Sequence, residues 1–173
     1  MIEGQKCYLR AIEPTDIEYV YKWENDTTSW DDSDIRHPIS QIAIETLIAQ
    51  ASIDVYQTRQ TRLIICTIND NNVVGCVDMF DFDPYNMRCG IGIIIDTEYR
   101  GKGYATEAIG LMCNYLFKTI GIHSIYATMR EKNMISQHIF TKCGFEQIGV
   151  RKDWIKIGDI FENEIFMQKI VHK

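Results

Sequence analysis

The stretch whose residue types and spacing are best suited to chemistry is Tyr99–Thr106, which follows the apolar run Ile91–Ile95. Its glycines allow the backbone to turn tightly, so that successive N–H groups can point into one concavity. An amphipathic segment follows, and the N-terminus of a helix adds partial positive charge at the same place. Arg100 and Lys102 supply full positive charges. These features predict an anion site, for which a pyrophosphate is the natural ligand.

The spacing discriminates among the known pyrophosphate loops. The nucleoside-triphosphate loop needs four residues between its first glycine and a Gly-Lys-Ser/Thr, but here Gly101-Lys102 is followed by Gly103. The dinucleotide loop needs a third glycine where this chain has Thr106. The remaining pattern, Arg-x-x-Gly-x-Ala over residues 100–105, resembles the coenzyme A pyrophosphate loop of the GNAT superfamily of N-acyltransferases. An ordinary glycine-rich turn between a strand and a helix is the alternative.

The composition is typical of a single globular domain over residues 1–173, with 46% hydrophobic and 24% charged residues. No apolar run reaches the roughly 18 residues of a membrane span, and the first residues lack the apolar centre of a signal peptide. The net charge of −6 argues against nucleic-acid binding through a basic surface. The six cysteines and four histidines show no metal-site spacing. We therefore expect no metal, buried reduced thiols and a cytoplasmic protein.

The sequence contains no internal repeats and no linker. The spacing of its hydrophobic residues predicts a series of strands and helices. The expected order is a strand, two helices, a meander of three strands, a long helix, a strand, a short helix and two final strands. The strand after the long helix should lie parallel to the strand before it, because such crossovers are right-handed. This order predicts an α/β sandwich with a mixed seven-stranded sheet and about four helices. The expected strands are residues 7–12, 63–68, 73–82, 88–95, 124–129, 146–157 and 161–170, and the expected helices are residues 14–23, 103–119 and 134–143 with another after Ser40.

This order is also that of the GNAT fold, whose sheet is splayed in the middle. Further segments resemble the branch of the superfamily that holds spermidine, diamine and ribosomal-protein acetyltransferases, namely Leu9–Asp16, Trp23–Asp26, Asp78–Asp83, and Asn133 with Ile139–Phe145. The resemblance covers nearly the whole chain. It implies an acetyl-CoA-dependent N-acetyltransferase that transfers directly to a primary amine in a ternary complex, with a small polyamine or diamine as acceptor. Relatives in this branch often assemble, so a homo-oligomer is a further expectation.

The resemblance also implies where acetyl-CoA binds. The strand before the loop splays away from the strand after the long helix, and its exposed backbone pairs with the pantetheine arm like an added strand. A backbone N–H near Ile94 can polarise the thioester carbonyl. Asn133 contacts the arm or is only a helix cap, and Lys142 reaches a phosphate or is only a solvated lysine. The expected cofactor-binding residues are Ile93, Ile94, Ile95, Arg100, Gly101, Lys102, Gly103, Tyr104, Ala105, Thr106, Asn133, Phe140 and Lys142.

Transfer needs a neutral amine, but an alkylamine with a pKa near ~10.4 is mostly protonated at pH 7. A carboxylate can accept that proton directly or through water. Asp78 occupies the strand position at which relatives often carry an acidic residue, so it is the expected catalytic base or amine-binding group; an exposed strand residue is the alternative. The acidic residues at 24–34 and 78–83 either attract a cationic substrate or form solvated loops. The expected substrate-binding residues are Glu24, Asp26, Asp78 and Asp81.

Phe140 is the clearest departure from the family pattern, because many relatives carry a tyrosine there that serves the departing thiolate. Phenylalanine cannot donate a proton. Three options remain: protonation by water, a tyrosine from another strand such as Tyr126, or slow transfer. Two rival functions stay open. One is N-terminal acetylation of a protein such as a ribosomal protein, whose acceptor would need an open groove rather than an acidic pocket. The other, which Phe140 keeps open, is a non-catalytic acyl-CoA-binding module.

Overall fold

A computed structural model describes residues 1–32 and 36–171 of the chain. These residues form one eight-stranded sheet with the order β1-β2-β3-β4-β5-β6-β8-β7. Neighbouring strands are antiparallel except β5 and β6, whose parallel pairing confirms the predicted crossover. The strands are β1 (Ile2–Glu3), β2 (Cys7–Ala11), β3 (Thr61–Thr67), β4 (Val73–Asp83), β5 (Arg88–Ile95), β6 (Ser124–Arg130), β7 (Glu146–Ile157) and β8 (Ile160–Ile170).

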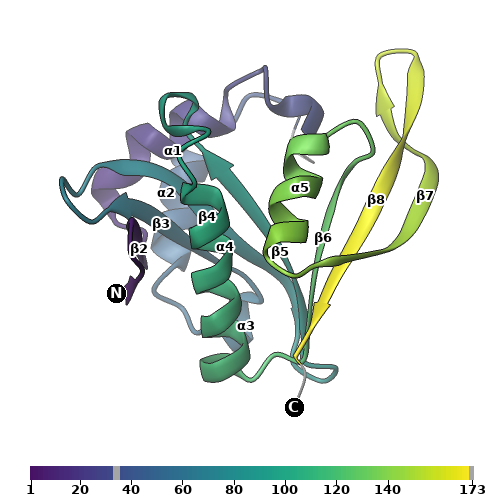
Figure 1. Ribbon diagram of the computed structural model, residues 1–173. Helices are drawn as coiled ribbons and strands as arrows, with labels where there is room; N and C mark the ends of the chain where they lie inside the picture. The colour runs from purple at the N-terminus through teal and green to yellow at the C-terminus, as the bar shows by residue number, and fades with distance from the viewer. Residues whose placement is uncertain (33–35, 172–173) are drawn as a thin grey trace.

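Helices cover both faces of the sheet (Figure 1). On one face α4 packs through Ala108, Ile109 and Met112 into the larger hydrophobic core. On the other face α1 and α2 build a second core with the inward side chains of β3. Each buried aliphatic side chain contributes about 1.5–3 kcal/mol by leaving water. The helices are α1 (Ile17–Glu24), α2 (Gln41–Gln50), α3 (Val55–Thr58), α4 (Tyr104–Tyr115) and α5 (Met134–Lys142), with 3-10 turns at Pro14–Asp16, Trp30–Asp32 and Thr97–Tyr99 and a π turn at Leu116–Ile120.

The sheet opens between β5 and β6 (Figure 1). The two strands pair only where Arg88–Gly90 of β5 lies beside Ser124–Tyr126 of β6. Beyond Gly90, β5 continues to Ile95 and pairs with β4 on its other side. Within the described residues, positions 91–95 therefore have no ladder partner on the side of β6. The predicted splay is confirmed, and it leaves a gap beside the exposed edge of β5.

Side chains alternate along β4 as a strand between two packed layers requires. Val77 and Met79 belong to the larger core under α4, whereas Cys76 belongs to the second core. Asp78 lies between Val77 and Met79 and so shares the face of Cys76, as the sequence predicts. This alternation places Asp78 on the side of the sheet that α1 and α2 cover.

Two element counts differ from the sequence prediction within the described residues. The sheet has eight strands rather than seven, because the two residues of β1 pair with β2. There are five α-helices rather than about four, because α3 forms one short turn after Asp54. The Asp54 carboxylate caps that turn by accepting a hydrogen bond from the Tyr56 N–H at 2.7 Å. Elements of two to four residues are too short to produce a periodic pattern.

Several predicted helix ends are confirmed. The Ser40 hydroxyl accepts a hydrogen bond from the first turn of α2 at 3.2 Å, and the Asn133 side chain does the same for α5 at 3.0 Å. Gly121 and Gly144 follow α4 with its π turn and α5, and both have the left-handed φ that favours glycine. The predicted hairpin at Gly158 joins β7 to β8.

All six cysteines are buried and unbridged, as expected of reduced thiols. Burial raises the pKa of Cys7, Cys89 and Cys113 to about 12, so these thiols stay protonated at neutral pH. None of the described helices combines the length and the apolar character needed to span a bilayer.

Candidate active site

The edge of β5 that faces the gap is formed by residues 93–95, all half-buried. Ile93 and Ile95 pack into the larger core and Ile94 packs into the second core, so the side chains are anchored on the two faces of the sheet. The backbone between them lies at the gap. Backbone N–H and C=O groups need a partner once they are covered. An amide-bearing chain laid along this edge can supply one, in the manner of an added strand.

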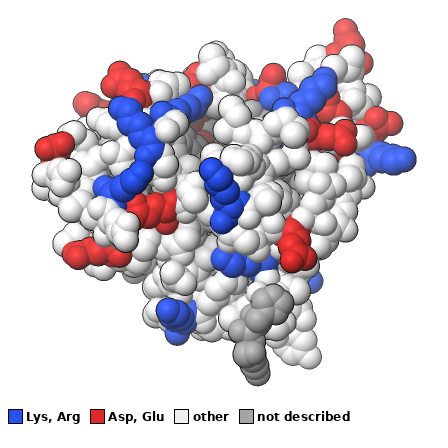
Figure 2. Space-filling view, in the orientation of Figure 1, with Lys and Arg blue, Asp and Glu red and all other residues white. Residues whose placement is uncertain are grey.

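The loop between β5 and α4 forms a cradle at the mouth of the gap. Gly101 and Gly103 have φ values of 76° and 90°, in the left-handed region that glycine adopts without steric cost. A Cβ at Gly101 would project into open space. Gly103 is the N-cap of α4, so the first N–H groups of the helix have no partner inside it. Arg100 and Lys102 are exposed, and basic side chains gather over this end of α4 (Figure 2). The cradle fits an anion of the phosphate type.

Buried Asp96 fixes the start of this loop relative to α1. Its carboxylate accepts hydrogen bonds from Lys22 Nζ at 2.8 Å and from Trp23 Nε1 at 3.0 Å. Burial by itself raises the pKa of Asp96, but these hydrogen bonds outweigh burial and hold the pKa below its ordinary value. Arg100 Nε donates to the Ile95 carbonyl at 3.0 Å and ties the other side of the loop to β5.

The three residues of α5 and its N-cap that the sequence predicted to bind the cofactor lie in different surroundings. Asn133 is half-buried at the N-cap, where its side chain accepts from the Ser136 N–H. Phe140 is only 4% exposed, and its ring packs edge-on against Phe145 at a centroid distance of 5.1 Å. Lys142 is exposed. Phe140 therefore supports α5 from the core, and it offers no polar group to a ligand.

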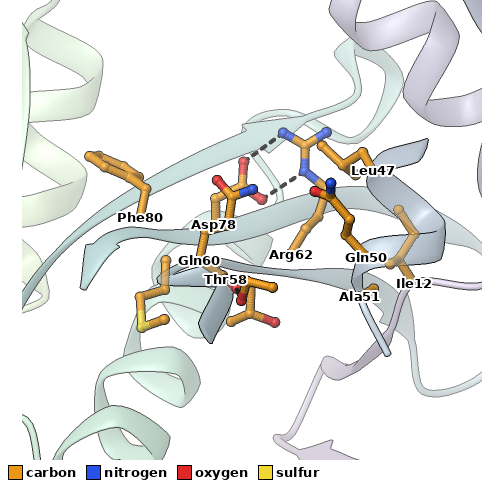
Figure 3. A pocket seen from close by; sticks show the side chains of 11 residues that line it. Ile12, Leu47, Gln50, Ala51, Thr58, Gln60, Arg62, Asp78 and Phe80 are labelled. Carbon is orange, nitrogen blue, oxygen red and sulfur yellow. Dashed lines mark hydrogen bonds and ion pairs between the residues drawn. The ribbon is translucent and has the colours of Figure 1, made fainter. Parts of the chain in front are cut away.

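Asp78 and Glu24 share one guanidinium group, that of Arg62. Arg62 on β3 lies opposite Asp78 on β4, and its Nε and Nη2 donate to the two carboxylate oxygens at 2.7 and 2.8 Å (Figure 3). Arg62 Nη1 donates to Glu24 Oε1, at the end of α1, at 2.6 Å. The side chains of Arg62, Asp78 and Glu24 are 14%, 23% and 12% exposed. This Arg62 cluster ties α1 to two strands and brings together two of the predicted substrate residues.

The Arg62 cluster carries an excess negative charge, because two carboxylates surround one cation. Burial alone lowers the pKa of Arg62, but nearby Asp78 and Glu24 help to outweigh burial and keep the guanidinium charged. A carboxylate oxygen can accept more than one hydrogen bond, so the cluster retains acceptor capacity. Arg62 and Asp78 line a cavity of about 130 Å³ whose walls include Ile12, Leu47 and Phe80 (Figure 3). The arrangement is suited to binding a second cation.

β5 presents no side chain opposite Asp78. Gly92 faces Asp78 across the ladder, and Gly90 faces Phe80. The Phe80 ring lies over Gly90, where a Cβ would come within 2.3 Å of a ring carbon. At Gly92 the same ring is 3.6 Å from the position of a Cβ. Gly92 therefore places no side chain beside Asp78, and the Phe80 ring packs over both glycines.

Asp81 belongs to a second group of side chains. It has a φ of 52° at a bulge of β4, and its carboxylate accepts a hydrogen bond from the Tyr126 hydroxyl at 2.8 Å. The Tyr126 ring packs edge-on against Phe80 and stacks on Phe166. Burial, together with the hydrogen bond to Asp81, raises the pKa of Tyr126. These four side chains line an open cavity of about 990 Å³ that strands β4, β6 and β8 share.

Asp26 lies apart from both groups. Its Oδ1 accepts from the backbone N–H of Thr28 at 3.0 Å and from the Thr28 hydroxyl at 2.7 Å. These hydrogen bonds lower the pKa of Asp26. Asp34 lies outside the described residues. Among the side chains of this acidic segment that the structure describes, Glu24 is the one that joins the Arg62 cluster.

The sequence prediction omitted Arg62, the residue that joins Glu24 to Asp78. The available signal was weak: an arginine at the polar start of a β-branched run. Its importance depends on the register of β3 against β4, which places Arg62 directly opposite Asp78. Register between distant strands cannot be read from the local pattern of either strand.

Comparisons with known proteins agree with this geometry. The family model "Acetyltransferase (GNAT) domain" matches residues 6–146. The chain is 28% identical to the probable N-acetyltransferase YjcK of Bacillus subtilis, over 94% of this chain and 93% of that protein. It is 25% identical to the spermidine N(1)-acetyltransferase of Escherichia coli, over 100% of this chain and 90% of that protein. The structure of spermidine N-acetyltransferase from Vibrio cholerae in complex with CoA and spermine superimposes with a TM-score of 0.87, at 21% identity, over 96% of both chains. The chain therefore belongs to the GNAT acetyltransferase family and is an N-acetyltransferase that uses acetyl-CoA.

Proposed function

We propose that this enzyme acetylates a primary amine of a small diamine or polyamine by direct transfer in a ternary complex. The observation that carries the proposal is the Arg62 cluster, in which two carboxylates share one cation near the gap of the sheet. A partly buried site with excess negative charge favours a cationic ligand. Two relatives that align over most of this chain, from Escherichia coli and Vibrio cholerae, are named spermidine N(1)-acetyltransferases.

The features of the gap and the loop fit acetyl-CoA. The edge of β5 at residues 91–95, which pairs with no strand on the side of β6, would hold the amide-rich arm, and the cradle at residues 100–106 would hold the pyrophosphate. Bound acetyl-CoA supplies an acetyl group activated as a thioester. An N–H near Ile94 would stabilise negative charge on its carbonyl oxygen. Lys142 of α5 and Asn133, the N-cap of that helix, remain candidate contacts for the cofactor. Buried Phe140 packs α5 against the core.

Asp78 is the proposed binding and proton-accepting group for the amine. Arg62 holds both of its oxygens in place, and the free lone pairs of those oxygens can accept from an ammonium or a bridging water. Glu24 adds the second negative charge. Because Gly92 has no side chain, β5 would place none between an amine held by Asp78 and the gap. Removal of the proton then produces the neutral amine that transfer requires.

Water is the proposed proton source for the sulfur that leaves. Phe140 has no proton to donate, and the Tyr126 hydroxyl is already directed to Asp81. A free thiol has a pKa of only about 8.5, so the leaving group needs little assistance near neutral pH.

A panel of acceptors tests the proposal. Spermidine, spermine and putrescine should be acetylated, and a peptide with a free N-terminus should not. Asp78→Asn should lower kcat/KM for the amine by about 10²–10⁴-fold while the KM for acetyl-CoA stays constant. Asp70→Asn, which changes an exposed turn carboxylate, serves as the matched control. Acetylation of the peptide without turnover of any polyamine would instead support N-terminal acetylation.

A further inference from the structure

The turn between β1 and β2 is attached to the first turn of α4. Glu107 of α4 accepts hydrogen bonds from the backbone N–H groups of Gln5 and Lys6, the latter at 2.9 Å. The Cys7 thiol lies 3.7 Å from the same carboxylate. These contacts join residues about 100 positions apart in the chain. They hold the N-terminal turn beside the loop that precedes α4.

This attachment places the Lys6 ammonium on the loop itself. Lys6 Nζ donates to the Lys102 carbonyl at 3.2 Å. It also lies 3.1 Å from the position that a Cβ on Gly103 would occupy. An ammonium group has three donors, and the carbonyl uses one of them. The carboxylate of Glu107 is directed at backbone N–H groups of the turn, whereas the ammonium of Lys6 is directed at the loop.

We propose that Lys6 is a third cation of the pyrophosphate site, supplied by the N-terminal turn in addition to Arg100 and Lys102 of the loop. The inference rests on the proposed placement of the cofactor in the cradle at residues 100–106. It explains why basic side chains gather at this end of α4 in a chain whose net charge is −6 (Figure 2). The ammonium would pair with a phosphate oxygen while it holds the loop through the Lys102 carbonyl.

The test measures binding rather than turnover. Isothermal calorimetry gives the affinity of the whole chain for CoA, dephospho-CoA and pantetheine. Lys6→Met should weaken CoA binding about three- to tenfold. Dephospho-CoA, which keeps the pyrophosphate, should show the same loss, and pantetheine, which lacks phosphate, should show none. Lys6→Arg should retain most of the affinity. Lys118→Met, in the π turn that follows the C-terminal end of α4, is the control and should bind like the wild type.

Three results would overturn the inference. Unchanged CoA affinity in Lys6→Met shows that Lys6 does not contact the cofactor. An equal loss for pantetheine shows a structural role, and a loss confined to CoA shows a contact with the ribose phosphate. The proposed acceptor is tested separately, because the polyamine panel does not depend on Lys6. Failure of the wild-type chain to bind CoA would remove the proposed function and this inference together.

Discussion

Replacement of Arg62 by methionine tests the cluster that defines the proposed amine site. The guanidinium donates to Asp78 at 2.7 and 2.8 Å and to Glu24 at 2.6 Å, and its side chain is 14% exposed. Methionine fills much of the volume of the arginine side chain, but it leaves the carboxylates of Asp78 and Glu24 close together without a cation. Breaking a buried ion pair in this way costs about 3–5 kcal/mol. Because Asp78 is 23% exposed, solvent reduces the cost, and we expect about 3 kcal/mol.

Thermal unfolding measures this change directly. For a chain of this length, about 3 kcal/mol corresponds to a fall in Tm of roughly 6–12 °C. Arg62→Lys keeps one charge but loses the two-pronged contact with Asp78, so its fall in Tm should be smaller.

A compensated variant separates stability from activity. Adding Glu24→Gln and Asp78→Asn to Arg62→Met removes the uncompensated charges, so much of the lost Tm should return. Acetylation of spermidine should nevertheless stay at least about 10²-fold below wild type, because the proton acceptor is gone. A Tm within 1–2 °C of wild type in Arg62→Met alone would refute this reasoning. So would full activity in the compensated variant.

Three further perturbations follow from the same structure. Asp96→Asn should cost about 1.5–3 kcal/mol at pH 7, because Asp96 accepts from Lys22 and Trp23. Since the folded pKa of Asp96 is lowered, its stabilisation is complete above the unfolded pKa near ~3.8 and is lost as the pH falls through the folded pKa. The Tm difference between Asp96→Asn and wild type should therefore stay constant from pH 7 to about 4 and shrink only as the pH falls below ~3.8. Gly101→Val should weaken CoA binding more than tenfold by calorimetry, because φ is 76° there and valine strains the cradle; equal affinity would contradict the cradle. Tyr126→Phe should change kcat by less than about fivefold if water serves the leaving sulfur, whereas a loss near 10²-fold would assign that proton to Tyr126.

The parts of the fold that could be predicted are those fixed by local chemistry. The caps at Ser40 and Asn133 depend on one side chain and the next turn of backbone. The opposite facing of Asp78 and Met79 depends only on the alternation within one strand. The parallel pairing of β5 and β6 follows from the handedness of the crossover through α4.

What could not be predicted depends on distant contacts. The role of Arg62 requires the register of β3 against β4 and the end of α1 above them. The contact of Lys6 with the loop requires Glu107 to hold a turn about 100 residues away. Asp81 follows Asp78 by three residues on the same strand, but at the bulge, where its φ is 52°, its carboxylate meets Tyr126 rather than Arg62. A cytoplasmic location and self-association stay predictions of the sequence.

A crystal structure of the wild-type chain with CoA and spermidine tests the central claim most directly. We expect the pyrophosphate on residues 100–106, the arm along the edge of β5, and a spermidine nitrogen within hydrogen-bond distance of Asp78 or Glu24. Spermidine bound beside Asp81 and Tyr126, with the Arg62 cluster closed to it, would contradict the assignment of the amine site. A cradle without CoA would contradict the account as a whole.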